Sequence, residues 1–216
     1  MSVLVYTESW EGIFRKSTFE AVSYASETAK LLDTDVVAVS LGEVSDDELS
    51  KLGNFGATKV ISIASVNKGD SQGTTNAIAS LSSDAPAIVF SNTYSAKMIA
   101  PRLSAKLNAG AISNVIEVAS NTSPFTVKRK AFSTKAIEIT TVSSEKAILS
   151  LAPNSFGLRE TAGSCSIEKS DFSENGIITI EGQETASGKI SISEAEIVVS
   201  GGRGLKGPEN WGMIEE

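Results

Sequence analysis

Apolar runs alternate with helix-periodic stretches over the first 92 residues of the chain. Four short runs rich in Val, Ile and Leu are typical of buried strands and lie at 3–7, 36–41, 60–64 and 86–90. The stretches between them carry capping residues or apolar residues at helical spacing, which predicts helices near 17–32, 45–52 and 74–81. Strands that alternate with helices pair in parallel, so this part predicts a parallel sheet covered on both faces.

A hydroxyl-rich loop follows the fourth strand at 91–95. Ligands of open α/β sheets bind at the carboxyl ends of the strands, so this loop is one candidate ligand site. The other interpretation, which is the more frequent one, is that Ser91 or Ser95 caps the next helix. Pro101 lies early in that helix, so the regular part either begins near Ile99 or kinks at the proline.

The character of the chain changes after residue 113. Short runs separated by polar turns leave no room for helices and predict strands at 115–118, 125–131, 136–141 and 147–151. Such spacing is typical of antiparallel hairpins. The predicted fold class is therefore α/β, with a Rossmann-like parallel sheet flanked by helices and an added small antiparallel β portion.

A basic triplet, Lys128, Arg129 and Lys130, lies inside one of these strands, with Lys135 and Lys146 nearby. Side chains alternate between the two faces of a strand, so only two of the three can share a face. The ordinary interpretation is a charged edge that resists aggregation. The alternative is a docking patch for an acidic partner surface.

Residues 152–160 show no periodicity and predict an ordered loop, in which Phe156 either is exposed with Arg159 or fills the core beneath. A further strand is predicted at 177–181. The last apolar run, 196–200, predicts a strand that leads into Gly201, Gly202, Arg203 and Gly204.

The glycine–arginine turn has the chemistry of an anion site. Gly201, Gly202 and Gly204 leave the backbone amides open to a phosphate, and Arg203 can fork onto phosphate or lie against an aromatic ring system. The turn lacks the usual dinucleotide and P-loop fingerprints, so by itself it is a weak signal.

The composition argues against several kinds of catalytic, metal-binding and nucleic-acid-binding site. The chain of 216 residues is 41% apolar, carries a net charge of −7 and has no histidine. The missing histidine excludes Ser-His-Asp catalysis and most zinc sites, and the acidic charge disfavours nucleic acid and anionic membranes. The single cysteine, Cys165, cannot form an internal disulfide and has no imidazole to activate it, so a packing role is expected.

No apolar run approaches the roughly 20 residues of a membrane-spanning helix, and a strand is expected directly at the N-terminus without a basic and apolar leader. The sequence therefore predicts a protein without membrane insertion in the cytoplasm of a bacterium or archaeon.

Several segments together resemble the alpha subunit of electron transfer flavoproteins. They are VVSGGRG at 198–204, VLVYTE at 3–8, LGNFGATKV at 52–60, IAPRLSAKL at 99–107 and AISNV at 111–115, in the order of that family. The resemblance covers nearly the whole chain. One departure is Asn114, where the family commonly has an acidic residue.

The resemblance implies an electron carrier without catalysis of its own. It implies FAD in the full-length complex, contacted at the position of Arg203, a beta subunit as the packing partner, and flavin dehydrogenases and a quinone reductase as redox partners. It divides the chain into an N-terminal α/β subunit-packing domain at 1–184, a linker at 185–194, and the first strand and loop of a truncated FAD-binding domain at 195–216. This chain alone is therefore expected to bind FAD weakly or not at all. Phe156 and Arg159 would lie near the subunit contact.

Two other functions stay open at this point. A stand-alone nucleotide-binding stress-type α/β domain would use the loops after the first and fourth strands, although residues 91–95 lack the glycines that enclose a phosphate. A small hydrolase would use Ser91 or Ser95 with Asp84 or Glu8, and would need Lys97 as its base.

Overall fold

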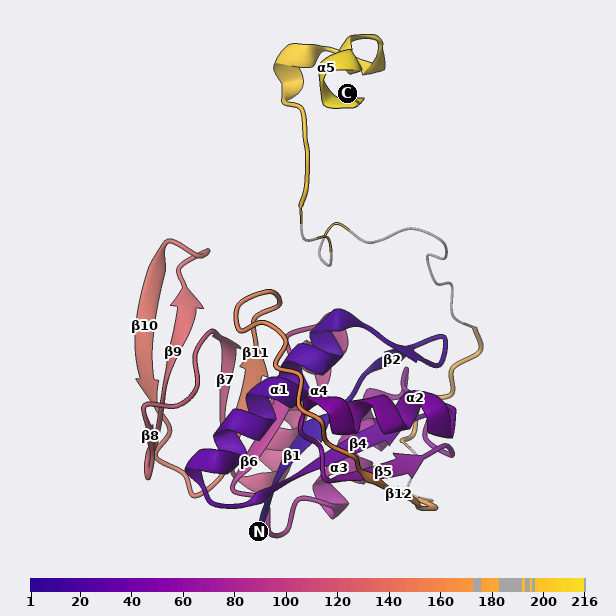
Figure 1. Ribbon diagram of the computed structural model, residues 1–216, viewed down its shortest axis with the longest axis vertical. Helices are drawn as coiled ribbons and strands as arrows, with labels where there is room; N and C mark the ends of the chain where they lie inside the picture. Colours follow the sequence, from indigo (N-terminus) through magenta and orange to yellow (C-terminus); the bar gives the residue numbers. More distant parts are fainter. Residues whose placement is uncertain (173–175, 183–191, 193–194, 196, 216) are drawn as a thin grey trace. The chain divides into compact units, whose positions relative to one another are not determined.

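The computed structural model describes residues 1–172, 176–182, 192, 195 and 197–215 (Figure 1). The chain divides into two compact units, 1–182 and 183–216. The first unit holds the sheet and its helices, and the second holds short helical turns. The predicted linker, 185–194, falls almost wholly outside the described residues.

The first unit is built on a ten-stranded sheet with the strand order β10-β9-β7-β11-β6-β1-β4-β5-β12, with β8 beside β9. Seven strands pair in parallel. They are β1 (Ser2–Tyr6), β4 (Asp35–Leu41), β5 (Lys59–Ile63), β6 (Ala87–Ser91), β7 (Gly110–Val115), β11 (Ala147–Leu151) and β12 (Ser166–Lys169). The antiparallel strands β8 (Asn121–Thr122), β9 (Phe125–Ala131) and β10 (Ala136–Thr141) extend one edge of this sheet. A separate hairpin consists of β2 (Ser9–Trp10) and β3 (Ile13–Phe14).

Helices cover both faces of the parallel part. Alternate residues of β1 show the division: Val3 and Val5 pack with α1 (Lys16–Leu31), α2 (Asp46–Ser50) and the 3-10 helix η1 (Lys51–Phe55). Leu4 and Tyr6 pack with α3 (Ser71–Ser80) and α4 (Tyr94–Leu107). This arrangement gives two apolar cores on one sheet and confirms the predicted fold class.

The predicted helix boundaries are partly confirmed. Ser45 caps α2 by accepting the Glu48 N–H at 3.3 Å, as its hydroxyl predicts. The cap of α4 is Thr93, which accepts the Ala96 N–H at 3.1 Å, so neither Ser91 nor Ser95 caps this helix. The helix runs from Tyr94 through Pro101, and a start near Ile99 was the wrong alternative.

The strand predictions after residue 113 need three corrections. The strand predicted at 115–118 lies earlier, at β7. The strand at 147–151 is β11, which pairs in parallel between β6 and β7 and does not belong to the antiparallel portion. Residues 177–181 form no strand, and the sheet edge is instead taken by β12, which pairs with β5.

Candidate functional site

In the β9–β10 hairpin, β9 has one face on the core and one in solvent, and β10 has exposed residues on both faces. Phe125 and Val127 on β9 are buried. On the opposite face, Ile137 pairs with Lys130 and Ile139 pairs with Lys128. The side chains of Ile137 and Ile139 are 65% and 68% exposed, which is unusual for two large apolar residues on one strand face. We call these four residues, Lys128, Lys130, Ile137 and Ile139, the hairpin face.

The basic triplet is divided between the two faces, as the alternation requires. Lys128 and Lys130 lie on the hairpin face, whereas Arg129 is opposite, across from Glu138 at 3.7 Å. Lys128 also pairs with Glu117 at 2.9 Å. Lys146 does not add to the basic side chains of the hairpin face, because its Nζ donates to Ser83 O, in the loop before β6, at 2.5 Å.

The predicted glycine–arginine turn lies in the second unit. Gly202 precedes the 3-10 helix η2 (Arg203–Leu205), and the Leu205 N–H donates to Gly202 O at 3.0 Å. A Cβ added at Gly202 or at Gly204 would have no heavy atom within 4 Å, so the space beside both residues is open. Arg203 is exposed, and no hydrogen bond or ion pair joins its guanidinium group to the described residues.

Gly201 differs from its two neighbours. A Cβ at this position would overlap Leu205 Cδ1 and lie 2.6 Å from Ile214 Cδ1, so this glycine allows the tail to fold over it. The tail continues as η3 (Pro208–Asn210) and α5 (Gly212–Glu215). The strand predicted before the turn is not formed at 197–200, where Ile197, Val198 and Val199 are exposed. A strand needs a hydrogen-bonding neighbour, and these residues have none in the described part of the chain.

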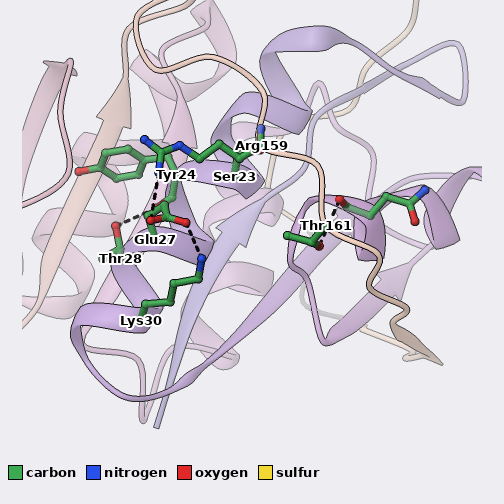
Figure 2. A network of polar contacts seen from close by, with 8 residues as sticks. Ser23, Tyr24, Glu27, Thr28, Lys30, Arg159 and Thr161 are labelled. Carbon is green, nitrogen blue, oxygen red and sulfur yellow. Dashed lines mark hydrogen bonds and ion pairs between the residues drawn. The ribbon is translucent and has the colours of Figure 1, made fainter.

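The loop at 152–160 is ordered, as predicted, by contacts with one face of α1 (Figure 2). Arg159 lies over the Phe156 ring at 4.5 Å and pairs with Glu27 at 3.1 Å, and Glu27 also binds Lys30 at 2.6 Å. Phe156 is half-buried and meets the Tyr24 ring edge-on at 5.4 Å. Phe156 therefore packs on the core beneath the loop, while Arg159 stays exposed.

Sequence reasoning missed the residue that holds this loop. Glu20 on α1 is 1% exposed and accepts backbone N–H groups from Asn154, Phe156 and Gly157 at 2.7–2.8 Å. A lone glutamate on an amphipathic helix gives no signal of burial, because most glutamates on such helices face water.

The carboxyl ends of β1 and β6 bring several polar side chains together. Ser95 Oγ donates to Glu8 Oε1 at 2.6 Å, and Lys68 Nζ donates to Ser9 O at 2.8 Å. Burial lowers the pKa of Lys68, while the nearby Glu8 carboxylate opposes this change. Asn114 accepts from Asn92 at 2.5 Å, so the residue that departs from the family pattern has a neutral partner.

The hydrolase prediction is only partly met here. Glu8 and Ser95 do meet, but Asp84 precedes β6 while Ser91 ends it, so these two lie at opposite ends of the strand. Lys97 lies over the Tyr94 ring at 5.0 Å, and no hydrogen bond joins it to either serine in the described part.

Cys165 Sγ lies 3.8 Å from Leu49 O, and burial raises the pKa of its thiol, as expected for a packing residue.

The residues that the structure describes contain neither a metal-binding cluster nor a membrane-spanning helix. No group of three or more acidic, Cys or His side chains could hold a metal ion. No helix among these residues is long and apolar enough to cross a membrane.

The model of the electron transfer flavoprotein domain family matches residues 3–175. The chain belongs to the electron transfer flavoprotein family. The matched residues include the sheet, the helices on both of its faces and the hairpin face. It confirms the resemblance seen in the sequence, and it does not favour the alternative of a stress-type nucleotide-binding domain.

Relatives within the electron transfer flavoprotein family extend the match to the end of the chain. The alpha subunit from Bacillus subtilis is 30% identical over 99% of this chain and 68% of its own length. That from Syntrophomonas wolfei is 26% identical over 98% of this chain and 68% of its own. The alpha subunit from Pseudomonas aeruginosa is 33% identical over 56% of this chain and 40% of its own. The glycine–arginine turn therefore lies inside the region shared with the first two.

Proposed function

We propose that this chain serves as the alpha subunit of an electron transfer flavoprotein, an electron carrier that catalyses no bond chemistry itself. The observation that carries this proposal is the match to alpha subunits over 99% of the chain, from the first strand to the turn. The expected redox partners are flavin dehydrogenases on the donor side and a quinone reductase on the acceptor side. The expected location is the cytoplasm.

The glycine–arginine turn is the part of this chain that fits FAD. Gly202 and Gly204 have open space beside their backbone, and Arg203 offers an exposed guanidinium group without a protein partner among the described residues. A guanidinium group that has no partner among the described residues and lies beside open amides suits a pyrophosphate or the edge of an aromatic ring system. When bound, FAD would supply the electron-carrying chemistry, and these residues would help to hold and orient it.

The hairpin face is the surface that fits the beta subunit. Two exposed isoleucines lie opposite Lys130 and Lys128, and Lys128 also pairs with Glu117, so Lys130 supplies the basic rim of this apolar centre. This suits a partner with an apolar patch and an acidic group beside it. The acidic net charge of the chain makes this basic rim a local exception. The docking interpretation of the basic triplet is therefore the one we adopt.

Co-purification tests this function. The wild-type chain and its cognate beta subunit, expressed together, should elute as one complex. The double substitution Ile137→Thr with Ile139→Thr keeps β-branched side chains but removes apolar contact area, and should weaken the complex at least about tenfold. Met98→Thr, at another exposed apolar residue, is the matched control. Failure of the wild-type chain to bind the beta subunit would refute the proposal.

A second measurement concerns the cofactor. The isolated chain should retain no stoichiometric flavin. A complex of the beta subunit with this chain, extended by the part of a relative that the chain does not match, should show flavin absorbance. Arg203→Ala should lower the affinity of that complex for FAD, while Lys206→Ala on the same turn should change it less. Tight, stoichiometric FAD on the isolated chain would contradict the expectation.

A further inference from the structure

The chain that follows β12 packs against α3 and the loop before it. Ser65 Oγ donates to Phe172 O at 2.8 Å, and the Phe172 side chain packs on the core of that face. Farther along, the Ile177 N–H donates to Gln72 Oε1 at 3.4 Å. We call Phe172 together with residues 176–180 the strap. It is the last part of the first unit, which ends at residue 182.

Asp70 joins the strap to α3, and its two oxygens have different partners. Oδ1 accepts the N–H groups of Gln72 and Gly73 at 3.0 Å, which caps the helix. Oδ2 accepts the Gly176 N–H at 2.6 Å, which holds the strap. A helix cap needs only one side-chain oxygen, so the second contact is an addition to capping. The carboxylate is 5% exposed, so water competes little with either contact.

Three glycines make this close approach possible. A Cβ on Gly69 would lie 2.5 Å from Ile180 Cδ1, and one on Gly73 would lie 2.6 Å from Asp70 Oδ2. A Cβ on Gly176 would overlap the Asp70 carboxylate. None of these three residues has a positive φ, so backbone conformation does not explain the glycines. What they share is the absence of room for a side chain between the strap and α3.

We propose that Asp70 is a clamp that fixes the strap on α3 and so sets the place from which the chain leaves the first unit toward residues 183–216. With the clamp closed, the chain leaves beside the first turn of α3. With the clamp open, the last fixed point would be Phe172, which Ser65 and the core still hold. The clamp is a conformational device of the first unit, and it does not depend on the proposed function.

The ionisation of the Asp70 carboxylate strengthens its hydrogen bonds to the strap and to α3. Burial acts to raise the pKa of Asp70, but the N–H groups of Gly73, Gly176 and Gln72, together with the charge of Arg102 on α4, outweigh it and hold the pKa below its ordinary value. The carboxylate is therefore ionised at neutral pH, where hydrogen bonds to a charged acceptor are strongest.

Two substitutions separate the clamp from the helix cap. Asp70→Ser keeps a side-chain oxygen that can cap α3, but leaves no second oxygen for Gly176. Gly176→Ala keeps the Asp70 carboxylate but disturbs its contact with the strap, because an added Cβ would lie 2.3 Å from Asp70 Oδ1 and 2.6 Å from Oδ2. Gly182→Ala is the matched control, since a Cβ there meets no atom within 4 Å.

Hydrogen exchange of the 216-residue chain, followed by mass spectrometry, tests the clamp. In Asp70→Ser and Gly176→Ala, peptides that cover 176–180 should exchange at least about tenfold faster, because a hydrogen bond to a charged group is lost. Peptides from the body of α3, and all peptides of Gly182→Ala, should keep wild-type rates. Chymotrypsin should also cleave faster after Phe172 in the two clamp variants.

Two results would overturn the proposal. One is wild-type exchange of 176–180 in Gly176→Ala, the variant that keeps the Asp70 carboxylate. The other is acceleration by the same factor in the strap, α3 and β6, which would mean that the substitutions only destabilise the whole unit. If Asp70→Ser does not fold, Gly176→Ala decides alone.

Discussion

The parallel and antiparallel parts of the sheet are hydrogen-bonded to each other but differ in what covers them. Every residue of β6 and β11 is buried, whereas β10 has five exposed residues and one of intermediate exposure out of six. Helices close both faces of the parallel part, whereas β10 has exposed residues on both of its faces and only β9 has buried residues on one face. Packing energy is therefore concentrated in the parallel part, while the hairpin face keeps two large apolar side chains in solvent.

The largest effect is expected from the centre of the parallel part. Leu149→Ala on β11 removes a fully buried side chain that packs in the core under α1. The free energy of unfolding should fall by about 2–5 kcal/mol, measured by urea denaturation followed by circular dichroism. Ile139→Ala on the hairpin face, tested in parallel, should cost far less. Equal losses would remove the contrast between the two parts.

The next effect concerns the buried carboxylate under the loop at 152–160. Glu20→Ala would leave three backbone N–H groups without their acceptor, and should lower the free energy of unfolding by about 2–3 kcal/mol. Glu27→Ala on the same helix face removes exposed ion pairs and should cost less than about 1 kcal/mol. The same urea titration compares them, and similar costs would show that Glu20 is not the anchor of the loop.

Acid should act mainly on the first unit. The pKa of Glu48 is lowered, because the hydrogen bond from Lys51, the Phe14 N–H and the Lys51 charge outweigh burial, and the pKa of Asp70 is lowered as well. A carboxylate with a lowered folded-state pKa contributes stability above its unfolded pKa and loses it as the pH falls through the folded value. Unfolding free energy should therefore decline below about pH 4.

The double variant Glu48→Gln with Asp70→Asn sharpens this test. It should be less stable than wild type at pH 7 and should show a flatter decline between about pH 5 and pH 3, because the two titrating groups are gone. Urea titrations across this range measure the slope. An unchanged slope would mean that other carboxylates govern acid unfolding.

The smallest effect on stability is expected on the hairpin face. Ile137→Thr with Ile139→Thr replaces exposed side chains, so the free energy of unfolding should change by less than about 0.5 kcal/mol per site. If this variant binds the beta subunit more weakly, the loss would then come from the docking contacts and not from unfolding of the chain. Thermal unfolding of the isolated variant provides this check, and a large fall in its melting temperature would remove the hairpin face as a pure docking surface.

The sequence predicted those elements whose signal is local. Four strands and three helices before residue 92 follow from apolar periodicity, and the Ser45 cap follows from its hydroxyl and the acidic turn after it. The short β2–β3 hairpin was not predicted. The alternation of β9 likewise placed Lys128 and Arg129 on opposite faces. In each case the relevant partners lie within a few residues of one another.

What the sequence did not predict depends on distant partners. The run at 147–151 looks like any hairpin strand, and only pairing with β6 and β7 makes it a central parallel strand. The short β12 exists because β5 offers it an edge, whereas the more apolar residues 197–200 find no strand to pair with in the described part. Glu20 and Asp70 are buried by loops more than a hundred residues away, so neither burial leaves a local trace.

Hydrogen exchange of the chain with and without its cognate beta subunit tests the central claim most directly. If the hairpin face is the docking surface of an alpha subunit, peptides that cover 126–141 should become protected when the beta subunit is added, while peptides from β6 and β11 stay unchanged. Protection confined to other surfaces, with 126–141 still exchanging as in the isolated chain, would contradict it.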